Sequence, residues 1–322
     1  MNSSYLIIAG TEKSGTTSVY QYLNSHPGVS GSTRKETDYF RSQPPHTQAA
    51  YNAMFPSVTS GGLRMEASPG YLAESNIVAS AIASVVSDAK ILFILRDPID
   101  RLLSSFEFHK SRFFIPPDME FDEYVGICMR FERGEINLDE AGLGDWFLRV
   151  PDAGRYARHL QDYEEHFSSE QIKVLTLDRL QIDPSAFMRE ICEWAGLSAE
   201  FYDDFEFVRS NVTFSPRLVW LQRLGLRVNE TMEPFFNRHP SVKRAMLLIY
   251  KRINGQRVEK SQMSAATAQL LLDYYEADVE ALCLRFGSDV VEARNWLKKH
   301  RRVSDQSLGH VPGYIANKGN AP

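Results

Sequence analysis

The strongest cluster of residues that could bind an anion lies near the N-terminus, between Gly10 and Thr17. Residues 5–9 form a short apolar run of the kind that becomes a buried strand in a parallel sheet, and apolar residues recur at helical spacing from Thr16 onward. The sequence therefore predicts a tight strand-to-helix turn. Its unpaired backbone amides, at the positive end of a helix dipole, would converge on one anion.

This turn differs from the usual nucleotide phosphate loop in the place of its lysine. Gly10 and Gly15 have the expected spacing, but Lys13 lies inside the loop instead of directly after the second glycine. From there the ammonium group could reach a bridging or terminal oxygen of the anion. Further contacts are expected from the residues around the second glycine, namely Ser14, Gly15, Thr16 and Thr17.

A second candidate anion contact follows the strand expected at residues 91–95, which runs directly into Arg96. Arg96 at the strand tip and Ser104 on the next helix could flank one phosphate, as a forked donor and a hydroxyl donor. An ion pair from Arg96 to Asp97 or Asp100 is the alternative. Magnesium-dependent phosphoryl transfer needs a carboxylate at such a strand end, so the arginine argues against it.

Two more pairs of residues are candidates. Lys35 and Glu36 follow a short strand expected at residues 29–32, and ligands of doubly wound sheets lie beyond the carboxyl ends of strands. A solvated ion pair in a loop is the alternative. Ser215 and Arg217 lie in a polar loop that is either a ligand contact or an ordinary connection before a helix.

The helices and strands that must position these residues predict an α/β protein with a parallel sheet. We expect residues 41–65 to be a polar loop or short helical excursion, and residues 66–71 to be a turn that returns to the sheet. Residues 110–152, rich in aromatic and charged side chains, are interpreted as a helical insertion or lid over the site. Further helices are expected near residues 77–86, 156–167, 184–195 and 270–286.

Composition limits the class of protein. The 322 residues, 43% hydrophobic and 24% charged, suit a single domain over 1–302 with a flexible tail at 303–322. The net charge of -5 argues against a nucleic-acid partner, and the basic run at 298–302 reads as a solvated helix face. Three dispersed cysteines indicate reduced thiols and a cytoplasmic protein. Neither a secretory signal nor a transmembrane segment is predicted.

Together, the two anion motifs resemble a known family. The stretches TEKSGTTSVYQYLNSHP and ILFILRDPIDRLLSSF are similar to the 5′-phosphosulfate loop and the 3′-phosphate element of sulfotransferases that use 3′-phosphoadenosine 5′-phosphosulfate (PAPS). RKETDYF, SPGYL and GRYARHLQDYEEHFSSEQIKVLTLDRLQIDP are most similar to the heparan sulfate and related glycan branch. The resemblance covers most of residues 5–217. It implies a P-loop-like three-layer fold, with a central parallel sheet flanked by helices.

The resemblance also implies roles for the cofactor-binding residues. Lys13 would neutralise the bridging oxygen as the sulfonyl group departs, and residues 14–17 would hold the 5′-phosphate. Arg96 and Ser104 would bind the 3′-phosphate, the group that distinguishes PAPS from ATP. PAPS is thus the expected co-substrate, PAP the product, and no metal is required.

For the acceptor side, the resemblance assigns Glu36 as general base and lets Lys35 orient the sulfonyl oxygens. The glycan branch often carries a lysine before the Ser/Thr-Pro of the SPGYL element, where this chain has Ala67. His109, on the helix after Arg96, is interpreted as structural or as a substrate contact. Because Golgi relatives carry a membrane anchor and none is predicted here, a bacterial or other cytosolic enzyme fits better.

Three functions remain open at this point. The favoured one is a sulfotransferase that moves the sulfonyl group of PAPS to a hydroxyl of a carbohydrate, glycolipid or glycosylated natural product. The alternatives are an ATP-dependent kinase of a small metabolite and a catalytically inactive nucleotide-binding scaffold. The sequence identifies neither the acceptor nor the oligomeric state.

Overall fold

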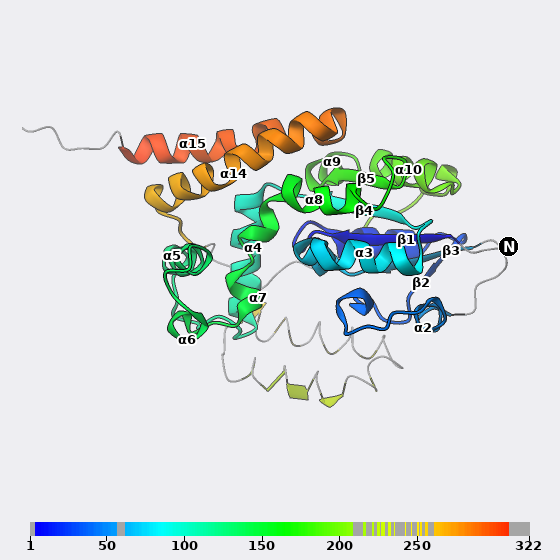
Figure 1. Ribbon diagram of the computed structural model, residues 1–322, viewed down its shortest axis with the longest axis horizontal. Coiled ribbons are helices and arrows are strands. Elements are labelled where there is room, and N and C mark those ends of the chain that lie inside the picture. Colours follow the sequence, from blue (N-terminus) through cyan, green and yellow to red (C-terminus); the bar gives the residue numbers. More distant parts are fainter. Residues whose placement is uncertain are drawn as a thin grey trace, which may run out of the picture.

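A computed structural model describes residues 4–56, 62–208 and 261–308, with short pieces between residues 215 and 256. Five strands form a central sheet in the order β2-β3-β1-β4-β5, and every neighbouring pair is parallel (Figure 1). The strands are β1 (Tyr5–Gly10), β2 (Val29–Gly31), β3 (Leu63–Ala67), β4 (Lys90–Leu95) and β5 (Ile172–Thr176). The predicted strands near residues 5–9, 29–32 and 91–95 are confirmed.

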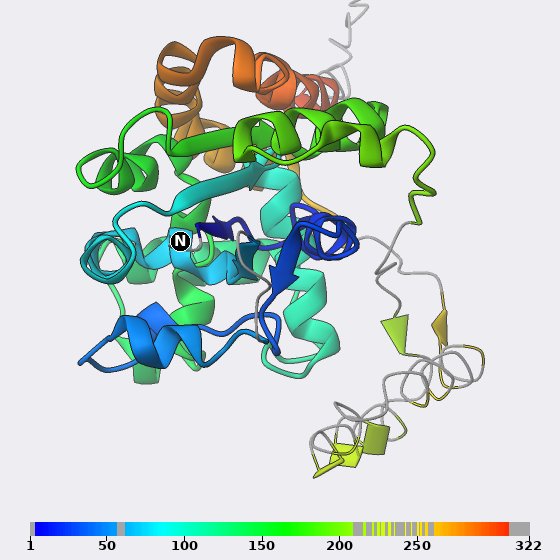
Figure 2. The same ribbon diagram turned by 90° about the vertical axis from the view of Figure 1, so that its right-hand side faces the viewer.

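Successive side chains of the central strands point to opposite faces and build two cores. Ile7 and Phe93 belong to one core, and Ile8 and Leu92 belong to the other. Helices cover both faces (Figures 1 and 2). The first core is closed by α3 (Ser75–Val85), α4 (Pro98–Ser111), α8 (Tyr156–Glu164) and α14 (Ala265–Phe286), the second by α1 (Thr16–Asn24) and α10 (Pro184–Ala195). The predicted three-layer α/β fold is therefore confirmed.

Shorter elements surround this frame. Residues 110–152, the expected helical insertion, carry α5 (Phe121–Glu132), α6 (Leu138–Ala141) and α7 (Asp145–Leu148). Three further helices in the described residues are α2 (Gln48–Asn52), α9 (Leu177–Ile182) and α15 (Ala293–Leu308). Short 3-10 helices are η1 (Tyr39–Arg41), η2 (Pro69–Glu74), η3 (Asp152–Gly154), η4 (Ala199–Tyr202) and η5 (Gly287–Val290). Of the helices in the described ranges, none is both long and apolar enough to cross a bilayer.

Strand β3 (Leu63–Ala67) corrects the sequence analysis. Residues 41–65 were expected to be an excursion and residues 66–71 a turn, but β3 pairs with β2 on one side and with β1 on the other. The strand escaped prediction because Arg64 and Glu66 interrupt its apolar pattern. Glu66 nevertheless has no solvent exposure, so it faces the protein interior as a polar group.

The C-terminal basic run fits its expectation only in part. Lys298, Lys299 and Arg301 are exposed, as expected of a solvated face, but α15 packs beside α14 and buries His300 (Figure 1). Trp296 is 3% exposed and its indole nitrogen donates to Asp178 Oδ2 over 2.9 Å, so this side chain packs onto the core. The helix continues to Leu308, beyond the expected domain end at 302. The rest of the predicted tail, 309–322, lies outside the described residues.

Candidate active site

The first anion loop lies at the carboxyl end of β1, in the middle of the sheet. Gly15 precedes α1 with a φ of +84°, in the left-handed region that favours glycine, and a Cβ there would lie 2.9 Å from Leu177 Cδ1. The Ser14 hydroxyl is fully buried, and it finds no hydrogen-bond partner in the described part of the chain. Because a buried polar group without a partner is costly, Ser14 fits a loop that is completed by a bound anion.

Thr16 is buried in the first turn of α1, and Thr17 is half-buried beside it. Both lie in the first turn of α1, where the sequence predicted a helix to begin. The loop residues 14–17 thus combine buried hydroxyls with a helix N-terminus at one place.

Lys13 lies among charged side chains, two of which, Arg96 and Glu36, are candidate site residues. Its Nζ lies 4.1 Å from the centroid of the Phe108 ring on α4. Burial lowers the pKa of Lys13; the positive charges of Arg96 and Arg112 lower it too, while Glu12 and Glu36 oppose the shift. A bound anion would reduce the repulsion among these cations. The charges around the loop therefore favour anion binding.

Arg96 links the two anion motifs. Its Nη1 donates to the backbone oxygen of Lys13 over 3.2 Å, and its own backbone oxygen accepts from the Tyr156 hydroxyl at 2.7 Å. The structure thus places the arginine that follows β4 directly against the loop that follows β1. Ser104 is half-buried on α4.

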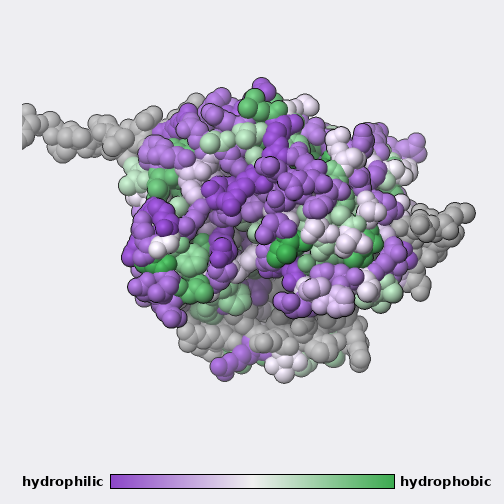
Figure 3. All heavy atoms as spheres, in the orientation of Figure 1, coloured by the Kyte–Doolittle hydropathy of each residue, from purple (hydrophilic) through white to green (hydrophobic). Residues whose placement is uncertain are grey.

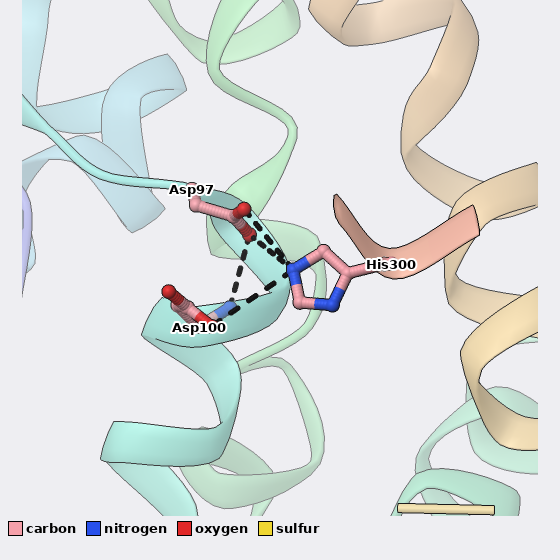
Figure 4. Close-up of side chains that lie close together, drawn as sticks. All are labelled: Asp97, Asp100 and His300. Carbon is pink, nitrogen blue, oxygen red and sulfur yellow. Dashed lines mark hydrogen bonds and ion pairs between the residues drawn. The ribbon is translucent and has the colours of Figure 1, made fainter. Parts of the chain in front are cut away.

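The acidic residues next to Arg96 are engaged by α15 (Figure 4). Asp97 caps α4 by accepting from the backbone nitrogens of Ile99 and Asp100 at 3.0 and 3.1 Å. His300 Nε2 lies 3.1 Å from Asp97 Oδ2, and Lys299 Nζ lies 2.9 Å from Asp97 Oδ2 and 2.5 Å from Asp100 Oδ2. The expected alternative, an ion pair between Arg96 and these aspartates, is replaced by this four-residue clamp.

The clamp has side chains that could ligate a metal, since Asp97, Asp100 and His300 offer ligand atoms within 4.8 Å of one another. The Lys299 ammonium, however, already contacts both carboxylates. Burial raises the pKa of Asp97, but the hydrogen bond and charge of His300, with Lys299, outweigh it and hold the pKa below its usual range. The arrangement is that of a paired-charge contact between two helices.

Lys35 and Glu36 lie at the carboxyl end of β3. The Glu36 backbone nitrogen donates to Ala67 O over 3.0 Å. The backbone of Glu36 has a φ of +63°, in the left-handed region. Its side chain is 53% exposed and forms an ion pair with Lys35. Because Glu36 is also among the charges that act on Lys13, the carboxylate lies within electrostatic reach of the anion loop. An accessible carboxylate beside the anion site can accept a proton from an incoming hydroxyl.

The sequence analysis missed Glu66, which supports this segment. Its buried carboxylate accepts from four hydroxyl groups, those of Thr37, Tyr51, Ser68 and Tyr71. Burial raises the pKa of Glu66, while those hydrogen bonds act against the rise. The Thr37 contact ties the chain just after Glu36 to β3. The signal available in the sequence was a glutamate directly before Ala-Ser-Pro-Gly-Tyr, in a stretch where Leu63, Met65 and Ala67 alternate with charged residues.

His109 is packed into the wall of the site. Its Nε2 lies 3.4 Å from Glu12 Oε1, and its ring contacts Phe147 of α7 with centroids 4.9 Å apart. Burial raises the pKa of Glu12, but its contact with the His109 imidazole outweighs burial, so the net pKa is lowered. His109 therefore connects α4 to the residue before Lys13.

The last two candidates are not placed at the site. Ser215 lies in β6 (Ser215–Pro216), which pairs antiparallel with β7 (Gly255–Gln256), and Arg217 lies outside the described residues. Their assignment as cofactor contacts stays a prediction.

A parallel sheet with an anion loop and an arginine at neighbouring strand ends defines an α/β protein of P-loop-like architecture. The family model described as "Sulfotransferase domain" matches residues 3–238, so the chain belongs to this family. A sulfotransferase from Alicyclobacillus acidocaldarius has the same fold, with a TM-score of 0.61, 21% identity and coverage of 91% of this chain and all of that one.

Curated relatives point to the same family. Mouse heparan sulfate glucosamine 3-O-sulfotransferase 3B1 is 28% identical over 191 residues, 59% of this chain and 45% of the relative. A bifunctional heparan sulfate N-deacetylase/N-sulfotransferase 1 from Caenorhabditis briggsae is 26% identical over 221 residues, 66% of this chain and 24% of the relative. The chain thus spans less than half the length of these two proteins.

Proposed function

We propose that this protein transfers the sulfonyl group of PAPS to a hydroxyl of a carbohydrate or a glycosylated small molecule. The observation that carries the proposal is the contact of Arg96 Nη1 with Lys13 O, which joins two anion-binding elements from different strands. A nucleotide with phosphates at both its 5′ and 3′ ends requires two such elements side by side. Family membership and relatives named for heparan sulfate support the reaction and the carbohydrate class.

In this proposal the residues act as follows. Ser14 and the helix N-terminus hold the 5′-phosphate, and Arg96 with Ser104 holds the 3′-phosphate. The acceptor oxygen attacks sulfur, the bond from sulfur to the bridging oxygen breaks, and PAP leaves. Glu36 takes the acceptor proton, Lys35 orients the sulfonyl oxygens and Lys13 stabilises the charge that develops on the bridging oxygen.

Calorimetric titration with PAP, with ADP and with magnesium-ATP tests the nucleotide assignment. We expect PAP to bind without added metal and far more tightly than ADP. Arg96→Ala should weaken PAP binding roughly 10- to 100-fold, since a hydrogen bond to a charged group contributes about 1.5–3 kcal/mol. Arg34→Ala, at an exposed position on the loop after β2, is the control and should leave PAP affinity unchanged. Equal binding of ADP and PAP, with no effect of Arg96→Ala, would contradict the proposal and favour a kinase.

A further inference from the structure

A cavity of about 370 Å³ opens beside the anion loop, between η2, η3 and α7. Thr11 and Glu12, the residues directly before Lys13, form part of its wall. Figure 3 shows this face of the molecule hollowed between the region of α7 and that of α3. The volume falls within the range of ligand pockets, roughly 300–1,000 Å³. A molecule held there would lie next to the loop that carries the reacting group.

One wall of the cavity is flat and amphipathic. The Arg41 guanidinium carbon lies 4.5 Å from the centroid of the half-buried Trp146 ring on α7. A Cβ on Gly70 would lie 3.0 Å from Arg41 Nη1 and 3.4 Å from Trp146 Cη2, so the glycine leaves room for this pair. An indole ring that packs against a guanidinium offers both apolar area and hydrogen bonds, as a ring that carries several hydroxyls requires.

Four of the six charges that line the cavity form two ion pairs with each other. Arg41 Nε donates to Glu74 Oε1 over 3.0 Å, and Arg149 Nε lies 2.8 Å from Asp145 Oδ2. The lining contains three arginines and three carboxylates, so its formal charges sum to zero. The positively charged lining residues are Arg41, Arg101 and Arg149, and the negatively charged ones are Glu12, Glu74 and Asp145. An anionic glycan would need accessible cations without carboxylate partners, because buried charges must be complementary to bind. The remaining arginine, Arg101, is 1% exposed and donates to the backbone oxygen of Val150, so it offers little surface to a ligand.

We propose that this cavity is the acceptor site and that it takes a neutral sugar or glycoside rather than an anionic glycan. The proposal rests on the proposed sulfotransferase function. The sugar ring lies against Trp146 and Arg41, with its hydroxyls hydrogen-bonded to the paired carboxylates and guanidinium groups. One hydroxyl points toward the anion loop. Side chains of the expected insertion, Trp146 above all, thereby determine acceptor class.

Two glycosides with the same aglycone but different charge test whether the cavity prefers a neutral sugar over an anionic one. p-Nitrophenyl β-D-glucopyranoside and p-nitrophenyl β-D-glucuronide differ at carbon 6, where the second carries a carboxylate. Calorimetry on the full chain, with and without saturating PAP, gives their affinities, and initial rates with PAPS give kcat/KM. We expect the glucoside to be favoured at least tenfold by both measures.

Trp146→Ala should weaken glucoside binding at least tenfold and leave PAP affinity unchanged, while Trp146→Phe should keep part of the affinity. Trp194→Ala is the matched control, since Trp194 is also half-buried beside a cation, Lys90, but at the amino end of β4. The double variant Glu74→Gln/Asp145→Asn releases Arg41 and Arg149 from their carboxylates. It should shift the preference toward the glucuronide at least tenfold.

The outcomes distinguish this proposal from the one it rests on. Equal or tighter binding of the glucuronide, no measurable binding of either glycoside, or no effect of Trp146→Ala on glucoside affinity overturns the acceptor proposal. PAP binding and glucoside binding without transfer of the sulfonyl group support the cavity assignment but contradict the proposed reaction. Failure to bind PAP contradicts the proposed function. In that case, the affinity for the glucoside measured without PAP decides whether the cavity binds a neutral sugar.

Discussion

Gly15 shows how strictly single residues in the anion loop are constrained. Its φ of +84° is strained for any other residue, and a Cβ would also meet Leu177 at 2.9 Å. Gly15→Ala should therefore destabilise the protein by about 1–3 kcal/mol, measured by urea unfolding. Gly134→Ala is the control, because Gly134 has a φ of +71° but open space around it. Equal losses in the two variants would mean that the Leu177 contact contributes nothing.

The Glu36 carboxylate tests the assignment of the base. Glu36→Gln keeps the size of the side chain but cannot take a proton, so sulfonyl transfer should fall about 100-fold or more while PAP affinity stays constant. Glu135→Gln, which removes an exposed carboxylate paired with Arg133, should change neither quantity. A wild-type rate in Glu36→Gln would move the search to Glu12, the next carboxylate beside Lys13.

Glu66 gives a prediction on pH and stability. Burial raises its pKa in the folded state above the unfolded value of about 4.3, so above that pH the folded state binds more protons at this group than the unfolded state. The stabilising contribution is complete below about pH 4.3 and is lost as pH rises through the raised pKa. Glu66→Gln should flatten this slope in the free energy of unfolding, measured at several pH values, whereas the exposed Glu123→Gln should preserve it.

At the scale of elements, the clamp between α4 and α15 should contribute both to the stability of the fold and to the affinity for PAP. Asp97→Ala removes a helix cap, which costs about 0.5–2 kcal/mol, and also removes one of the two carboxylates that His300 and Lys299 contact. Asp183→Ala removes only the cap of α10. We expect the first variant to lose more stability in thermal unfolding and, because Arg96 directly precedes Asp97, to bind PAP more weakly.

The pH dependence of the clamp has the opposite sign to that of Glu66. The folded-state pKa of Asp97 is lowered, so its contribution is complete above the unfolded value of about 3.9 and is lost as pH falls through the lowered pKa. Asp97→Asn should therefore narrow the stability difference between pH 7 and acid. An unchanged acid transition in Asp97→Asn, measured by circular dichroism, would contradict this account.

The helices and strands that could be predicted from the sequence are those specified by residues close together in the chain, through apolar runs and helix caps. The apolar runs of β1 and β4 and the caps of α10, Asp183 and Gly196, are read directly from neighbouring residues. Strand β3 was missed because Glu66 is compatible with a buried strand only through hydroxyl donors from other segments. The clamp joins residues 203 positions apart, and no local periodicity encodes such a contact.

At the scale of the whole molecule, the sheet order explains how the site assembles. β1 lies between β3 and β4, so the chain crosses over β1 on its way from β3 to β4. Loops after neighbouring parallel strands meet at one edge, and a ligand lies where the strand order reverses. This topology brings Lys13, Glu36 and Arg96 together although three separate segments supply them. The motifs were readable in the sequence, while the shape of the acceptor cavity depends on how η2, η3 and α7 pack.

The predicted division into one domain and a tail can be tested through α15. Trp296 and Leu297 are buried against the core, and Lys299 and His300 hold the start of α4. A chain that ends at Glu292 loses the contacts of all four residues, and truncation of one buried large aromatic side chain alone costs about 3–5 kcal/mol. We expect its Tm to fall steeply or cooperative unfolding to disappear, whereas a chain that ends at Leu308 should keep the Tm and PAP affinity of the full protein. Trp296→Phe, a milder change, should give an intermediate Tm. An unchanged Tm in the shorter chain would show that α15 is not part of the domain.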